Sequence, residues 1–322
     1  MVYVMLILGF LLLIKGADLF VEGSSSVAKI LHVPSMIIGL TVVAFGTSMP
    51  EAAVSITASI KGANDLAISN IIGSNIFNLL VVLGSCAIIH SVHAKHSVIK
   101  QEFPFSIIIT FVLLILLSNF AFTDIISGTG TYTLGRMGGI LLLILFIIFL
   151  VSTVRDALKA RSEYQSEGEE DYKVLSTQKS AVFILIGIAG ICWGGDLVVD
   201  SATAIAKSFG LSQTLIGLTI VALGTSLPEL VTSIVASSKG ENDLAIGNVI
   251  GSNIFNILMI LGVSSLISPI EVDITAIYDT AILAIVSVIG YICTVKQKGV
   301  SKKQGFLFIG MYLMFFVYIL FR

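Results

Sequence analysis

The chain contains the stretch Gly39-Leu-Thr-Val-Val-Ala-Phe-Gly-Thr-Ser-Met-Pro-Glu51, and 178 positions later it repeats it as Gly217-Leu-Thr-Ile-Val-Ala-Leu-Gly-Thr-Ser-Leu-Pro-Glu229, with ten of thirteen residues identical. A second block follows each copy in the same register. It reads Gly62-Ala-Asn-Asp-Leu-Ala-Ile-Ser-Asn-Ile-Ile-Gly-Ser-Asn-Ile-Phe-Asn78 in the first copy and Gly240-Glu-Asn-Asp-Leu-Ala-Ile-Gly-Asn-Val-Ile-Gly-Ser-Asn-Ile-Phe-Asn256 in the second. A constant offset over both blocks indicates an internal duplication.

The composition around these blocks is that of a membrane protein. Of the 322 residues, 56% are hydrophobic and only 12% are charged, and the mean hydropathy is +1.03. These values lie far outside the range of a soluble domain. The apolar segments approach the roughly 20 residues that a spanning helix needs, and they are too long and too uniformly apolar for barrel strands. We therefore predict an all-α integral membrane protein. Its ten predicted transmembrane helices are Val2–Phe20, Met36–Ile60, Leu66–Ile88, Phe103–Phe120, Leu134–Val154, Ser180–Val199, Thr214–Ala236, Leu244–Ile267, Thr275–Val295 and Gly305–Phe321.

The repeat divides these helices into two groups of five. We predict a first five-helix repeat at 1–154, a hydrophilic cytoplasmic linker at 155–179, and a second repeat at 180–322, with the duplicated motifs at 39–78 and 217–256. Because each repeat holds an odd number of spans, the second copy enters the membrane in the opposite orientation. Inverted repeats of this kind are a recurrent architecture of secondary transporters, which bind substrate near the middle of the bilayer where the repeats meet.

Basic residues in the short loops predict the orientation of the whole chain. An external N-terminus assigns thirteen Lys and Arg residues to the cytoplasm and leaves four outside, which is the bias that cytoplasmic loops carry. We therefore expect a multi-pass protein of the plasma membrane with both termini external. Its expected surroundings are the lipid bilayer and inorganic cations, with no nucleic-acid partner, and a monomer is consistent with the sequence.

Glu51 and Glu229 are the residues that demand a functional explanation. Glu51 lies fifteen residues after Met36 and nine before Ile60, which at 1.5 Å per residue places it well inside the hydrocarbon. Glu229 has the equivalent depth in the second half. A charged side chain there costs at least about 2.5–3.5 kcal/mol, so an acid at this depth indicates a functional site. Two of them at repeat-related positions strengthen that interpretation.

The residues around each acid supply oxygen ligands. Thr47 and Glu51 are four positions apart, as are Thr225 and Glu229, so each pair is predicted to stack on one face of a helix. Pro50 and Pro228 lack an N–H and free backbone carbonyls one turn earlier. Carboxylates, hydroxyls, amides and freed carbonyls, without His or Cys, favour a hard cation such as Ca²⁺ or Na⁺. The two carboxylates carry a charge of −2, which one Ca²⁺ or a small number of Na⁺ ions neutralises. No cofactor is expected.

At these residues the chain resembles a known family. The Gly-Thr-Ser-x-Pro-Glu blocks at 46–51 and 224–229, followed by Gly-Ser-Asn-Ile-Phe-Asn at 73–78 and 251–256, are similar to the two alpha repeats of the ten-helix sodium/calcium exchangers, within the calcium/cation antiporter superfamily. The resemblance implies sodium/calcium antiport by alternating access, with sliding of the first and sixth helices. The ligands that it implies are Glu51, Glu229, Thr47 and Thr225 for calcium; Ser48, Ser74, Ser226, Ser252 and the carbonyls of Ala44 and Ala222 for sodium; and Asn78 and Asn256 at the remaining polar corners.

One position departs from part of the family. Potassium-dependent relatives, and some sodium/calcium exchangers, carry an aspartate where Asn256 stands. Here both symmetric corners, Asn78 and Asn256, are amides. An amide offers one carbonyl oxygen and no charge, so two fixed negative charges remain where those relatives have three. The expected consequence is transport driven by sodium alone, without potassium.

Rival interpretations remain at this point. A calcium or other cation/proton antiporter would use similar acids, and sodium stimulation of calcium flux would distinguish the two. An intramembrane protease, suggested by Gly194-Gly195-Asp196, lacks a second Gly-Asp motif facing the first. We therefore predict a transporter and no enzyme. His90, His93 and His96 are spaced by three residues in one loop, but no fourth ligand is evident for a metal there. The acidic run in the linker, at Glu163, Glu167, Glu169, Glu170 and Asp171, is predicted to be solvated.

Overall fold

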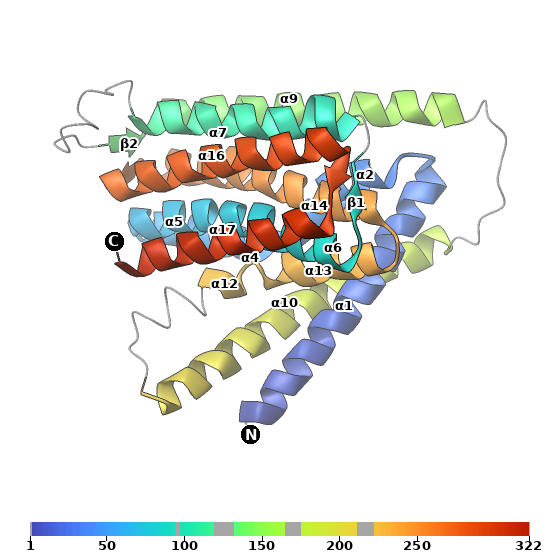
Figure 1. Cartoon of the computed structure of the whole chain (residues 1–322), viewed down its shortest axis with the longest axis horizontal. Coiled ribbons are helices and arrows are strands. Elements are labelled where there is room, and N and C mark those ends of the chain that lie inside the picture. The colour runs from blue at the N-terminus through green and yellow to red at the C-terminus, as the bar shows by residue number, and fades with distance from the viewer. Residues whose placement is uncertain (1, 95–96, 119–131, 165–174, 211–221, 322) are drawn as a thin grey trace. The chain divides into compact units, whose positions relative to one another are not determined.

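The fold is predominantly helical. The computed structural model describes residues 2–94, 97–118, 132–164, 175–210 and 222–321 (Figure 1). Within these residues, eight helices are long and apolar enough to cross a membrane, and a bent pair of helices at 35–60 supplies a ninth candidate. The chain is therefore an all-helical integral membrane protein, as predicted. The predicted seventh span, Thr214–Ala236, lies partly at 211–221, outside the described residues, so the count of ten stays a prediction.

The chain forms two compact units that do not coincide with the two halves of the sequence. The first unit combines residues 1–50 with 152–251, and the second combines 51–151 with 252–322. Each unit thus takes one segment from each half. The division at 1–154, 155–179 and 180–322 concerns the repeat in the sequence and stays a prediction.

The secondary structure follows the repeat closely. Each of four consecutive elements in the first half has a counterpart whose bounds are shifted by the same 178 positions. The matched elements are α4 (Met49–Ile60) and α13 (Leu227–Ser238), α5 (Asn64–Phe77) and α14 (Asn242–Phe255), η2 (Asn78–Val82) and η5 (Asn256–Ile260), and α6 (Leu83–Ile89) and α15 (Leu261–Ile267). Equal sequence in the two copies therefore produces equal local structure.

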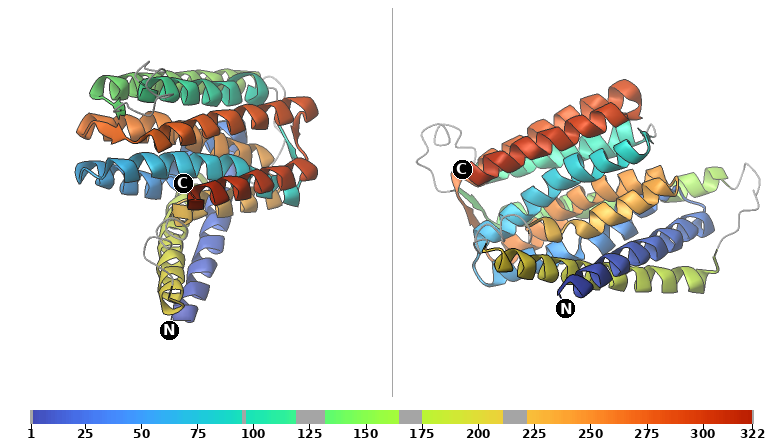
Figure 2. Two further views of the ribbon diagram at one scale, coloured as in Figure 1. Left: turned by 60° about the vertical axis from the view of Figure 1, so that its left-hand side comes forward. Right: turned by 60° about the horizontal axis from the view of Figure 1, so that its bottom comes forward.

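The first unit is organised around two long helices, α1 (Val2–Leu31) and α10 (Thr177–Ser208), which lie side by side in both views of Figure 2. Their backbones approach closely at small residues, as is common between helices in membranes. A Cβ atom on Gly16 would lie 2.7 Å from the backbone nitrogen of Ile191, so this contact requires glycine. The unit also contains α2 (Ser35–Ile38), η1 (Gly39–Val43), α3 (Ala44–Thr47), α12 (Ala222–Gly224) and α13.

The second unit is a bundle whose inner layer is the segment Leu66–Ile89. In the most apolar 18 residues of this segment, 78% of the residues are buried, against 17% in Lys302–Phe321. Leu66–Ile89 is therefore a core span, whereas Lys302–Phe321 is mostly exposed. This unit also contains most of α4, η3 (Val98–Glu102), α7 (Phe103–Ser118), α9 (Arg136–Tyr164) up to residue 151, η5, α15, α16 (Ile274–Gln297) and α17 (Lys302–Phe321). Phe105 of α7 stacks on Phe149 of α9, with ring centroids 5.6 Å apart.

Four short strands, which the sequence analysis did not predict, lie at the ends of helices in the second unit. Strand β1 (Val92–His93) pairs antiparallel with β4 (Gly299–Val300), and β2 (Tyr132–Leu134) pairs antiparallel with β3 (Ile270–Val272). Each pair joins one strand of the first half to one strand of the second. The strands thereby connect the two copies by backbone hydrogen bonds.

The predicted linker is partly helical. Helix α9 continues to Tyr164, ten residues into the segment predicted at 155–179, and α10 begins at Thr177. The acidic residues at 167–171 lie outside the described residues, as does His96 of the histidine cluster. The predictions for these two features therefore remain predictions.

Candidate functional site

Glu51 and Glu229 lie in the first turns of α4 and α13, two helices of 12 residues each. Both side chains are 0% exposed. Burying a charge is costly unless nearby groups compensate it. The N-terminal end of a helix carries a partial positive charge, which stabilises an anion in its first turn. The two acids predicted from the sequence thus occupy equivalent, buried and electrostatically favourable positions.

A break in the helix precedes each glutamate. Helix α3 ends at Thr47 and α4 begins at Met49, and Ser48 between them has φ −83° and ψ 8°. The two helical segments meet at an angle of 51°. Ser226, the residue before α13, has nearly the same conformation, with φ −92° and ψ 5°. Proline is the second residue of each following helix, where its missing N–H is tolerated and no helical bond to the preceding turn forms.

This break corrects one prediction. The sequence analysis stacked Thr47 on Glu51, and Thr225 on Glu229, along the face of an unbroken helix. The structure interrupts the helix between the two members of each pair, at Ser48 and at Ser226. The physical reason is the proline, which removes the donor that a continuous helix needs at that turn. Thr47 therefore ends α3 and Thr225 lies in the turn after α12, whereas each glutamate belongs to the start of the next helix.

In the first unit, a hydrogen bond joins a serine of the first motif copy to the glutamate of the second. Ser48 Oγ donates to Glu229 Oε1 at 2.9 Å, and both side chains are 0% exposed. A hydrogen bond to a carboxylate is charge-assisted and therefore stronger than one between neutral groups. A serine of the first copy is thus a direct partner of the glutamate of the second copy.

Asn248 of α14 organises the surroundings of this contact. Thr47 Oγ1 donates to Asn248 Oδ1 at 3.0 Å, and Asn248 Nδ2 donates to Ser233 Oγ at 2.9 Å. All three side chains are 0% exposed. Thr47 Oγ1 also lies 3.1 Å from the carbonyl oxygen of Val43. Because a hydroxyl has one hydrogen and two lone pairs, Thr47 keeps acceptor capacity for a cation while it donates.

The second unit contains the corresponding arrangement around Glu51. Ser74 Oγ donates to Glu51 Oε1 at 3.3 Å. Asn70 Nδ2 donates to Ser55 Oγ at 2.9 Å and to the backbone carbonyl of Glu51 at 3.4 Å. The Asn70–Ser55 contact repeats the Asn248–Ser233 contact 178 positions earlier and at the same distance. Each copy therefore braces its glutamate-bearing helix with the same amide.

Of the other predicted ligands, Thr225 and Ser226 lie in the turn before α13, whereas Ser252 lies within α14. Ser226 and Ser252 are 0% exposed, and Thr225 is half-buried. The carbonyl oxygen of Ala44 accepts the Ser48 N–H at 3.0 Å, and Ala222 is the first residue of α12.

The two corner asparagines begin turns of unusual geometry. Asn78 starts the π-helical turn η2 and Asn256 starts η5, and both side chains are 0% exposed. Single π-helical turns are rare and occur frequently at functional sites. The local conformation at Asn78 and Asn256 is thus the same in both copies, in keeping with their predicted equivalence.

The sequence analysis did not assign roles to four other asparagines. Asn70 and Asn248 brace Ser55 and Ser233, and Asn75 and Asn253 bond to each other's backbones. A signal was present, because all four are identical between the two copies of the second block. An amide one turn away from a predicted ligand, however, does not reveal from sequence whether it contacts the ligand.

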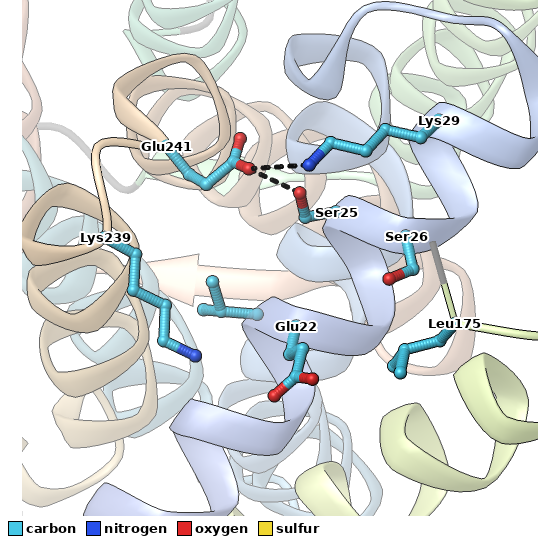
Figure 3. A pocket seen from close by; sticks show the side chains of 8 residues that line it. Glu22, Ser25, Ser26, Lys29, Leu175, Lys239 and Glu241 are labelled. Carbon is cyan, nitrogen blue, oxygen red and sulfur yellow. Dashed lines mark hydrogen bonds and ion pairs between the residues drawn. The ribbon is translucent and has the colours of Figure 1, made fainter. Parts of the chain in front are cut away.

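A separate polar pocket opens beside α1 in the first unit. It has a volume of about 440 Å³ and is lined by Glu22, Ser25, Lys29 and Glu241, among others (Figure 3). Ser25 Oγ donates to Glu241 Oε1, and Lys29 Nζ lies 3.9 Å from the same oxygen. The charges lining this pocket largely compensate one another. It therefore differs from the buried glutamate sites, where the hydroxyl groups of Ser48 and Ser74 donate to the carboxylates.

The contacts of Asp18 weaken the protease interpretation. Asp18 Oδ1 lies 2.6 Å from Lys239 Nζ, whereas a catalytic aspartate needs a second acid as its partner. Asp196, in the aligned position of the second half, is exposed. Both aspartates lie within long helices, Asp18 in α1 and Asp196 in α10.

Comparison with known proteins agrees with this geometry. A family model described as sodium/calcium exchanger protein matches residues 1–155 and 179–321. The sodium/calcium exchanger MaX1 of Methanosarcina acetivorans is 30% identical, over 98% of this chain and 97% of its own. The inner membrane protein YrbG of Escherichia coli is 38% identical, over 88% of this chain and 86% of its own. The solved structure of the sodium-calcium exchanger NCX_Mj, soaked with Na⁺ and Sr²⁺, has a TM-score of 0.81 and 34% identity, and the match covers 98% of each chain. With its duplicated motifs, its two buried glutamates and this agreement over nearly its full length, the chain belongs to the sodium/calcium exchanger protein family.

Proposed function

We propose that this protein exchanges sodium for calcium across the plasma membrane and that Glu51 and Glu229 bind the transported ions. Family membership supports cation/calcium antiport, and the members are transporters. The observation that carries the finer assignment is the contact between Ser48 Oγ and Glu229 Oε1, 2.9 Å apart and 0% exposed. It brings a predicted ligand of one motif copy to the carboxylate of the other, at a depth where an acid needs a function.

The proposed ligand set follows from the charge and hardness of the groups. Two carboxylates bind one Ca²⁺ or a small number of Na⁺ ions, and hydroxyl, amide and carbonyl oxygens complete the shell of a hard cation. Calcium is proposed to take Glu51, Glu229, Thr47 and Thr225. Sodium is proposed to take the serines and the backbone carbonyls. The proposed ligands for sodium are Ser48, Ser74, Ser226, Ser252, Ala44 and Ala222, with Asn78 and Asn256 as polar corners.

The proposed orientation has both termini outside the cell, as the basic loop residues favour. In this orientation the linker at 155–179 is cytoplasmic. Cysteine accessibility tests this independently of transport. A single cysteine introduced in place of Ser162 in the linker should be protected from an impermeant maleimide in intact cells and labelled after permeabilisation. Labelling before permeabilisation would reverse the proposed topology.

The experiment that tests the function is uptake of ⁴⁵Ca²⁺ into sodium-loaded proteoliposomes. We expect uptake to require an outward sodium gradient and to disappear when sodium is equal on both sides. The Glu229→Gln variant is the matched control, because it keeps the shape of the side chain and removes its charge. Uptake that ignores sodium and follows an imposed pH gradient would overturn sodium/calcium exchange in favour of cation/proton antiport.

A further inference from the structure

Four asparagines form a buried cluster in the second unit. Asn75 and Asn78 come from the α5–η2 segment, and Asn253 and Asn256 come from the equivalent α14–η5 segment. None is more than 4% exposed. Asn75 corresponds to Asn253 in the repeat, and Asn78 corresponds to Asn256. The contacts among the four asparagines occur twice, once in each direction between the copies.

The first contact fixes the orientation of two of the amides. Asn75 Nδ2 donates to the backbone carbonyl of Asn253 at 3.2 Å, and Asn253 Nδ2 donates to the backbone carbonyl of Asn75 at 3.2 Å. A carbonyl oxygen only accepts hydrogen bonds. The atom facing it in each case is therefore the NH₂ group. The Oδ1 atoms of Asn75 and Asn253 consequently point the other way, as acceptors.

The second contact passes this orientation on to the corner residues. Asn75 Oδ1 accepts from Asn256 Nδ2 at 3.0 Å, and Asn253 Oδ1 accepts from Asn78 Nδ2 at 3.3 Å. Asn256 Nδ2 also lies 3.3 Å from Ser74 Oγ. Because an oxygen already occupies the facing position, a flipped corner amide would set oxygen against oxygen. Two backbone carbonyls thus determine the orientation of all four amides.

The outcome is a pair of presented oxygens. Among the residues that the structure describes, neither Asn78 Oδ1 nor Asn256 Oδ1 has a hydrogen-bond partner, although both are buried. Leaving such an acceptor unsatisfied costs about 1–3 kcal/mol. Rotating the side-chain amide of Asn256 or Asn78 by 180° would not avoid this cost, because it would break the hydrogen bond to Asn75 or Asn253. The arrangement is explained if each oxygen is held for a cation.

We propose that Asn75 and Asn253 are positioning residues that make Asn256 and Asn78 present their carbonyl oxygens, and not their NH₂ groups, to the transported cation. This inference rests on the proposed function, because it assigns a role within the same site. It adds a requirement to the proposed set of ligands, namely a fixed orientation of the two corner amides. An amide can serve a cation site only if its orientation is fixed, whereas a carboxylate presents oxygen either way.

A double-mutant cycle on the full-length protein tests this proposal. Equilibrium binding of ⁴⁵Ca²⁺ is measured for the unmodified chain, Asn75→Leu, Asn256→Leu and the double variant. Asn75→Leu should weaken binding about fivefold or more, the worth of one neutral hydrogen bond. In the Asn256→Leu background the same change should have less than about half of that effect, because there is no amide left to orient.

The pair Asn75 and Asn78 is the matched control, because their side chains share no described hydrogen bond. Their effects should add. If Asn75→Leu acts equally in every background, its role is general packing and the positioning role is overturned, and unchanged binding in Asn75→Leu overturns it as well. Should Asn75→Leu not fold, Asn75→Ala and the mirror pair Asn253 and Asn78 give the same test. Absence of calcium binding in the unmodified chain would instead contradict the proposed function.

Discussion

The turn between α4 and α5 and the turn between α13 and α14 are the same structure with different side chains. Gly62 and Gly240 both adopt left-handed conformations, with φ of +71° and +80°, which favour glycine. The next residue closes both turns in the same way. Ala63 N donates to the Ala58 carbonyl at 2.8 Å, and Glu241 N donates to the Ala236 carbonyl at 2.9 Å. The duplication thus preserved the backbone of the turn.

The side chains of the two turns show where the copies were free to diverge. Glu241 accepts a hydrogen bond from Ser25 and pairs with Lys29, both of α1 (Figure 3). Lys239 pairs with Asp18. The equivalent of Glu241 in the first half is Ala63, which can form no ion pair. Identity persists at the buried residues of the proposed ion site and at Lys61 and Lys239, and is lost between Ala63 and Glu241. The comparison teaches that the proposed site is alike in both copies, whereas the Glu241 contact that anchors α1 belongs to one copy alone.

The severest test of this equivalence is removal of either carboxylate. Glu51→Gln and Glu229→Gln should each abolish sodium-driven ⁴⁵Ca²⁺ uptake, because each removes half of the fixed charge while keeping the side-chain shape. Monodisperse elution of each purified variant checks that it is folded. Near-normal flux in one variant alone would contradict the equivalence of Glu51 and Glu229, since the site would then depend on one copy.

A hydroxyl change tests the equivalence with a smaller effect. Ser48→Ala removes the donor to Glu229, and a hydrogen bond to a charged group contributes about 1.5–3 kcal/mol. We expect the calcium concentration for half-maximal uptake to rise roughly ten- to a hundredfold. Ser226→Ala, the equivalent change in the other copy, should give a similar rise. An unchanged calcium dependence in Ser48→Ala would contradict a ligand role for that serine.

The corner amides allow a sharper comparison, because a single atom can be changed at each. Replacing potassium by choline on both sides, under a clamped membrane potential, should leave sodium-driven calcium uptake of the unmodified chain unaltered. Asn256→Asp adds a titratable charge and should make uptake depend on pH or potassium, with little change in folding. Asn78→Asp is the matched change in the first copy. Collapse of flux in the unmodified chain without potassium, and its return on addition, would refute the charge-count argument.

The smallest expected effect lies at the exposed turns. Exposed ion pairs contribute about 0–1 kcal/mol each, so Lys239→Ala should lower the thermal unfolding temperature of the purified protein by a few degrees at most. Lys61→Ala is the control at the equivalent position, because the described residues include no ion pair for Lys61. Equal shifts in both variants would show that loss of charge, and not the Asp18 contact, is responsible.

The sequence predicted what depends on local pattern and on the repeat. It located the eight long apolar helices and the bent pair that the described residues contain, and the two buried glutamates. It also paired Asn78 with Asn256, which begin equivalent turns. It failed between Thr47 and Glu51, where spacing alone suggested a continuous helix and the consequence of Pro50 for that spacing was not carried through. It also left out Asn75 and Asn253, since their partners are backbone atoms of a segment 178 residues away. A contact of that kind depends on how segments pack, which spacing along one helix does not determine.

The two strand pairs have a consequence for how the protein is made. Strand β1 ends at His93, and its partner β4 begins at Gly299. Strand β2 ends at Leu134, and its partner β3 begins at Ile270. During synthesis, the first half is therefore complete while the edges of both its strands are still open. Open edges can pair with other chains, so the nascent first half depends on its surroundings for protection. The β2–β3 pair can close once residue 272 has been translated, and the β1–β4 pair only after residue 300. The final structure is therefore a property of both repeats together and not of either repeat alone.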